Sequence, residues 1–152
     1  MRSTQLTQFI KSPPAKVYQT LLDPQSLGKW KVPDGMQLEV HLFEPREGGH
    51  LSVSLTYEQP EHSGKTSAHT DTYHGRFERL IENKQIIEID EFETDDPSLQ
   101  GEMKITISLK EVPGGTELTA LHEGLPAGVA AEDNESGWRM SLGKLAALME
   151  IS

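Results

Sequence analysis

The sequence predicts an α+β domain in which a curved antiparallel β-sheet wraps around one long C-terminal α-helix. Two observations support this prediction. Through the middle of the chain, apolar residues recur at every second position in about six successive segments, as in half-buried strands. In residues 136–150 the spacing becomes helical, with Trp138, Leu142, Leu145 and Met149 on one stripe. A helix with so wide an apolar face must pack on another element, and the sheet supplies it.

The N-terminal quarter is expected to hold one strand and two short helices. Residues 3–11 alternate weakly and fit an edge strand. Ser12 is the expected N-cap of the first helix, with Pro13 at its first position. A second short helical turn carries Trp30, and residues 32–35 are expected to form a turn into the sheet.

The central strands follow from the period of two, and turn residues separate them. They are predicted at residues 36–43, 51–57, 73–77, 86–92, 103–109 and 118–122. Residues 58–69 are polar and are expected to form a loop. Short connections between consecutive strands require antiparallel pairing. In the terminal helix, Gly137 and Gly143 each cost about 1 kcal/mol relative to Ala, which suggests that another backbone passes close by, although a frayed first turn explains Gly137 equally well.

Composition excludes several classes of function. The 152 residues fit one domain, and the formal charge of −10 argues against nucleic acid, because phosphate binding needs clustered Lys and Arg. No apolar run approaches the ~20 residues of a membrane span, so membrane insertion is not expected. The chain has no cysteine, which excludes disulfides and thiolate chemistry and fits a cytoplasmic location.

Several short motifs, taken in order, carry a resemblance to a known superfamily. They are Leu21-Leu22-Asp23-Pro24 ahead of Trp30, Gly48-Gly49, Tyr73-His74-Gly75-Arg76-Phe77, Asp90-Glu91-Phe92, Gly115-Thr116-Glu117-Leu118-Thr119, Glu123-Gly124-Leu125-Pro126, and Gly137-Trp138 ahead of Leu142 and Leu145. Together they resemble the START-like (SRPBCC) superfamily, in the branch related to the C-terminal domain of the activator of Hsp90 ATPase.

The resemblance implies a helix-grip fold as one domain over residues 1–152, with a cavity between the sheet and the long helix. Such a cavity is able to hold an apolar ligand. The side chains expected to line it are Trp30, Tyr73, Phe77, Phe92, His122, Trp138 and Leu142.

The strand at residues 86–92 leaves two alternatives open. Its pattern places Ile87 and Ile89 inside and turns Glu88 and Asp90 to water, and this is the favoured reading. The parity implied by the resemblance instead places Glu88 and Asp90 inside, as two further ligand-binding candidates. Carboxylates facing an apolar cavity would have to be paired, for example with Arg76 or Arg139, or protonated, or functional.

No complete catalytic constellation is found in the sequence, and neither a metal nor a cofactor is expected. The histidines lack metal-ligand spacing, and His122 is read as a core histidine rather than a general base. Binding of an apolar or aromatic small molecule is the favoured function, with neutral molecules preferred over fatty acids because the protein is negatively charged. The alternatives are a cyclase- or hydrolase-type enzyme using Glu88, Asp90 or His122, and an Hsp90-linked interaction module that contacts a chaperone through its surface.

Overall fold

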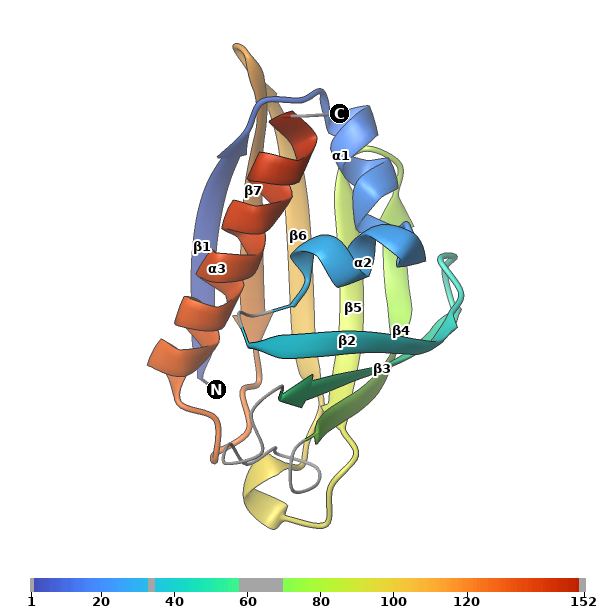
Figure 1. Cartoon of the computed structure of the whole chain (residues 1–152), viewed down its shortest axis with the longest axis vertical. Helices are drawn as coiled ribbons and strands as arrows, with labels where there is room; N and C mark the ends of the chain where they lie inside the picture. The colour runs from blue at the N-terminus through green and yellow to red at the C-terminus, as the bar shows by residue number, and fades with distance from the viewer. Residues whose placement is uncertain (1, 33–34, 58–69, 151–152) are drawn as a thin grey trace.

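The computed structural model describes residues 2–32, 35–57 and 70–150, and Figure 1 shows the arrangement of its elements. Their bounds are β1 (Ser3–Ile10), α1 (Pro14–Leu21), α2 (Pro24–Trp30), β2 (Met36–Phe43), β3 (His50–Tyr57), β4 (Thr70–Ile81), β5 (Gln85–Phe92), η1 (Pro97–Leu99), β6 (Met103–Val112), β7 (Gly115–Glu123) and α3 (Ala131–Glu150). The loop predicted at residues 58–69 and the centre of the turn predicted at 32–35 lie outside the described residues.

The described strands form one sheet in the order β1-β7-β6-β5-β4-β3-β2, and every pairing is antiparallel. From β2 to β7 each strand pairs with the next one in the sequence. The exception is β1, which lies beside β7 with Ser3 opposite Glu123. The predicted α+β class, the antiparallel sheet and the two short helices after the first strand are therefore confirmed.

The long helix α3 lies across the sheet and runs beside β1 (Figure 1). Leu142, Leu145 and Met149 are buried on its inner face, as the helical stripe predicts. The expectation about the two glycines is wrong: a Cβ built on Gly137 or Gly143 would meet nothing within 4 Å, so no backbone passes close to either.

The first helix begins one residue later than expected. Its N-cap is Pro13, without a side-chain cap, and α1 starts at Pro14. Ser12 is instead buried, and its carbonyl oxygen accepts a hydrogen bond of 2.7 Å from the hydroxyl of Thr116 on β7. Ser12 thus anchors the end of β1 to the sheet rather than capping the helix.

An irregularity in β2 breaks the alternation that the sequence suggests. The register against β3 shifts between Val40 and Leu42. Beyond this bulge Leu42 is 45% exposed, whereas Phe43 packs edge-on against Phe77, with ring centres 5.5 Å apart. A single extra residue in one strand moves the following side chains to the opposite face.

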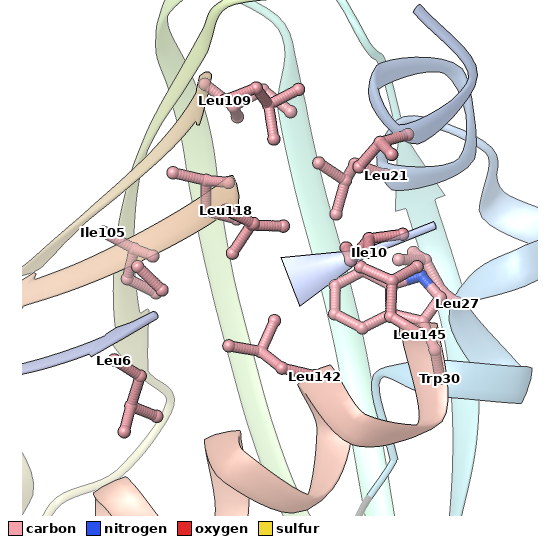
Figure 2. Close-up of a cluster of buried hydrophobic side chains, with 14 of the residues drawn as sticks. Leu6, Ile10, Leu21, Leu27, Trp30, Ile105, Leu109, Leu118, Leu142 and Leu145 are labelled. Atoms are coloured by element: carbon pink, nitrogen blue, oxygen red, sulfur yellow. The ribbon is translucent and has the colours of Figure 1, made fainter. Parts of the chain in front are cut away.

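The main core fills the space between the sheet, the two short helices and the C-terminal half of α3 (Figure 2). Its side chains come from elements distant in the sequence, including Ile10 of β1, Leu27 and Trp30 of α2, Leu118 of β7 and Leu145 of α3. All five are at most 2% exposed. This end of the helix–sheet interface is densely packed.

Candidate functional site

The N-terminal half of α3 covers a cavity of about 440 Å³ above the sheet. Side chains from β2 to β7 form its floor, and Asn134, Gly137, Trp138 and Ser141 of α3 form its roof. The volume lies in the range of ~300–1,000 Å³ typical of small-molecule sites. Because a Cβ at Gly137 would meet nothing within 4 Å, that glycine leaves part of the space open.

The nine candidate residues fall into three groups. Five of them line the cavity: Tyr73, Asp90, Phe92, His122 and Trp138. Three are packed in the core at 1% exposure: Trp30, Phe77 and Leu142. The ninth, Glu88, is buried next to the cavity and is bonded to Lys31, a lining residue.

Strand β5 is buried on both faces, and the favoured interpretation of its pattern is wrong. Glu88 and Asp90 are buried, and Asp90 points to the cavity side together with its neighbours in register. Ile87 and Ile89 are buried as well, on the opposite face. Ile89 lies in register between a lysine and an arginine, Lys104 and Arg76, whose long aliphatic stems can cover an apolar neighbour. A strand of this kind gives no alternation from which its inner face can be read.

A buried ion pair joins α2 to the sheet. The Nζ atom of Lys31 lies 3.4 Å from Oε2 of Glu88, and the two side chains are 13% and 10% exposed. The ammonium also hydrogen-bonds the Tyr73 hydroxyl, and it lies 5.8 Å from the centre of the Trp138 ring. The two arginines expected as partners do not fill this role: Arg76 pairs with Glu102 at 3.0 Å, and Arg139 is exposed.

This ion pair fixes the charge of both partners. Burial alone would lower the pKa of Lys31, but the Glu88 carboxylate raises it well above its ordinary value. Burial alone would raise the pKa of Glu88, but the Lys31 ammonium, with a hydrogen bond from Asp90, lowers it. Burial raises the pKa of Tyr73 to about 12. At neutral pH Lys31 and Glu88 are therefore charged and Tyr73 is neutral.

Asp90 is the contrasting carboxyl group. Burial, the nearby Glu88 carboxylate and the hydrogen bond between the two raise its pKa well above the ordinary value. A neutral Asp90 can donate this hydrogen bond to Glu88. Its Oδ1 atom has no hydrogen-bond partner among the described residues. It lies over Gly75, where a Cβ would overlap that oxygen, so the glycine in β4 makes room for the carboxyl group.

His122 forms the side of the cavity nearest to β1. Its Nδ1 atom lies 2.6 Å from Nδ2 of Asn134, which also donates to the Thr4 hydroxyl at 2.9 Å. Trp138 packs edge-on against the imidazole, with ring centres 4.5 Å apart. Burial and the positive charge of Lys31 lower the pKa of His122 to about 4. Because an amide nitrogen donates, Nδ1 accepts, and the neutral ring carries its proton on Nε2.

Comparison with known proteins agrees with this architecture. The model of the family described as Activator of Hsp90 ATPase homolog 1-like protein matches residues 11–150. The chain belongs to this family. This family match is consistent with the START-like (SRPBCC) resemblance that the sequence motifs carry.

Three solved structures show the likeness of fold. A protein from Chromobacterium violaceum is 32% identical, with a TM-score of 0.87, and the match covers 97% of this chain and 96% of that one. A protein from Rhodobacter sphaeroides is 21% identical, with a TM-score of 0.77 and coverage of 99% and 93%. An AHSA1-like protein from Aeromonas hydrophila is 14% identical, with a TM-score of 0.74 and coverage of 99% and 93%. The sequence matches no curated protein.

Two residues of this site were not predicted from the sequence, Lys31 and Asn134. Lys31 was not a candidate, although its position directly after the buried Trp30, at the end of α2, is a signal that it faces inward. Asn134 was not a candidate either, because the predicted helix began after it, whereas α3 starts at Ala131. A carboxylate that faces the interior requires a cationic partner. Once Glu88 is placed inside, a nearby lysine or arginine is therefore expected, and Lys31 is that residue.

The described residues show neither of two further features, a metal-ion site or a membrane-spanning helix. In residues 2–32, 35–57 and 70–150, no group of three or more histidine and acidic side chains is arranged to hold a metal ion. Within the same ranges, none of the helices combines the length and apolar character that a membrane crossing requires.

Proposed function

We propose that the protein binds an apolar or aromatic small molecule in the cavity under α3. The observation that supports this function is a space of about 440 Å³ bordered by Trp138, Tyr73, Phe92 and other apolar side chains. Well-packed protein interiors contain few voids larger than a water molecule, so a space of this size within a helix–sheet interface calls for an occupant. The mostly apolar wall gains free energy when a ligand replaces water there.

The direct test is binding of a neutral fluorescent dye such as Nile red, together with native mass spectrometry of the freshly purified protein. The expected result is a 1:1 complex with increased dye fluorescence. Gly137→Leu should abolish it, because the new side chain enters the cavity from the roof. Gly143→Leu is the matched control, since Gly143 lies on the same helix, is exposed and does not line the cavity. Dye binding that survives Gly137→Leu would place the binding site elsewhere and contradict the proposal.

Acid–base catalysis in the same cavity is a second candidate, and the Asp90–Glu88 pair favours it. A carboxyl group that keeps its proton at neutral pH beside an ionised one is a recurring arrangement in acid catalysts. Titration of both side chains by ¹³C NMR should show Asp90 protonated at neutral pH and Glu88 ionised. If Asp90 titrates near 3.8, its ordinary value, it is removed as an acid candidate.

The family description also suggests a contact with an Hsp90-type chaperone. Such a contact would use the protein surface rather than the cavity. Gly137→Leu therefore separates the two functions, because it fills the cavity and leaves the outer surface of the protein in place.

A further inference from the structure

The polar groups around the cavity narrow the class of ligand, and this inference rests on the proposed binding function. An ammonium group has three N–H donors. Among the described residues, Lys31 gives one to Glu88 and one to the Tyr73 hydroxyl. The third N–H has no partner in the part of the chain that the structure describes, and the side chain borders the cavity with 13% of its surface exposed. The cavity therefore offers a charged hydrogen-bond donor held in place by two other contacts.

The surrounding charges disfavour an anionic ligand for this donor. Glu88 already neutralises Lys31 at 3.4 Å. Asp90 and Asp133 border the same cavity, and neither supplies a positive charge. A ligand carboxylate would have to share the Lys31 ammonium with the Glu88 carboxylate, in surroundings where burial strengthens repulsion between like charges.

A cationic ligand is disfavoured for a different reason. The place that a ligand cation would take beside the Trp138 ring is already held by Lys31, whose Nζ lies 5.8 Å from the ring centre. A second ammonium would meet the first. Among the described lining residues, the charged donor that remains is Lys31, and it suits a neutral acceptor oxygen.

We propose that Lys31 donates its third N–H to an uncharged carbonyl oxygen, so that the cavity selects ketones, quinones or amides with an apolar body. The carbonyl end of the ligand lies against Lys31, between Tyr73 and Trp138. The apolar body extends toward Phe92 and Met103 on the floor. Glu88 and the Tyr73 hydroxyl do not contact the ligand in this arrangement; they position the ammonium.

A single ring scaffold carrying different polar groups tests the proposal. The probes are tetralin, 1-tetralone, 1-aminotetralin and tetralin-1-carboxylic acid, with affinities measured by calorimetry at neutral pH. We expect 1-tetralone to bind about 10-fold or more tightly than tetralin, as for one added hydrogen bond to a charged donor. The amine and the acid should bind more weakly than the ketone. Tightest binding by the acid or the amine would overturn the proposal.

The variant for this test removes both charges of the ion pair together. Lys31→Met alone would leave Glu88 buried and unpaired, so the variant is Lys31→Met/Glu88→Gln. Its affinity for tetralin should stay within about twofold of the wild type, and the preference for 1-tetralone should fall to about one. The matched control is Lys104→Met/Glu78→Gln, which removes an ion pair of 4.0 Å between half-exposed side chains of β6 and β4. The control should keep the full preference.

A spectroscopic measurement on the wild type keeps the test decisive if the double variant does not fold. The carbonyl stretching frequency of bound 1-tetralone should lie below its value in hexane, as expected for an oxygen that accepts a charged hydrogen bond. An unshifted frequency, or equal affinities for tetralin and 1-tetralone, would refute the role of Lys31 and leave cavity binding intact. Failure of all four probes to bind would instead count against the binding function itself.

Discussion

The two ends of the helix–sheet interface are built differently. At the end covered by α1, α2 and the C-terminal half of α3, fully buried apolar side chains such as Trp30, Leu118 and Leu145 fill the space (Figure 2). At the end covered by the N-terminal half of α3, the interface holds a cavity, a buried ion pair and a buried histidine. The packed end supplies the stability that the hollow end lacks, since cavities and buried polar groups both cost free energy.

The two tryptophans offer the largest test of this contrast, because they lie at the boundary, with ring centres 6.4 Å apart. Trp30 is 1% exposed and belongs to the packed end, so Trp30→Ala should lower the free energy of unfolding by ~3–5 kcal/mol. Trp138 borders the cavity, and Trp138→Ala should cost clearly less. Chemical denaturation with an unchanged m-value measures both. Equal costs would mean that the cavity end is as well packed as the core.

An intermediate effect concerns pH, because the hollow end contains His122. Its pKa is about 4 in the folded state against 6.5 ordinarily, so between these values the unfolded state binds a proton that the folded state does not. The contribution of His122 is therefore full above pH 6.5 and is lost as the pH falls to about 4, by ~3 kcal/mol in total. Asp90 contributes with the opposite sign, since its raised pKa favours folding at low pH.

Because these contributions oppose each other, the quantity to measure is the difference in unfolding free energy between wild type and His122→Gln at each pH. That difference should shrink by ~3 kcal/mol from pH 6.5 to 4. The control is His74→Gln, at a histidine side chain that is 52% exposed on the outer face of β4, and it should leave most of the wild-type slope unchanged. A pH-independent difference for His122→Gln would show that the imidazole is not held neutral.

The smallest expected change in stability concerns the two glycines of α3. Gly137→Ala and Gly143→Ala should each raise the free energy of unfolding by up to about 1 kcal/mol, because Ala favours a helix and neither Cβ meets another atom within 4 Å. Each should raise the melting temperature by about 2–4 °C. A loss of stability in Gly137→Ala alone would show that the roof of the cavity has no free space.

The packed end could be predicted from the sequence, and the hollow end only in part. The buried faces follow from the helical stripe of Leu142 and Leu145 and from the period of two in the strands. Burial of an apolar side chain is favourable whatever apolar group it contacts, so the pattern alone is sufficient. The bulge in β2 was not predicted, since one extra residue at Val40–Leu42 leaves no mark in composition.

The polar groups of the cavity were harder to predict for a physical reason. A buried carboxylate such as Glu88 is allowed only when its partner is in place, and that partner, Lys31, lies 57 residues away in the sequence. Periodicity is a property of one strand, so it carries no information about a pair of residues on two distant elements. The motif that includes Gly75 did carry information, because that glycine accommodates the Asp90 carboxyl group on the neighbouring strand.

The pairing of β1 with β7 has a consequence for the order of events during synthesis. Each strand from β2 to β7 pairs with a strand that is its neighbour in the sequence. In contrast, Ile10 of β1 pairs with Thr116 of β7, which is synthesised much later. The first strand therefore leaves the ribosome long before its native neighbour exists, and closing so long a loop carries an entropic cost. The edge next to α3 is completed only after β7, Gly115–Glu123, has been made.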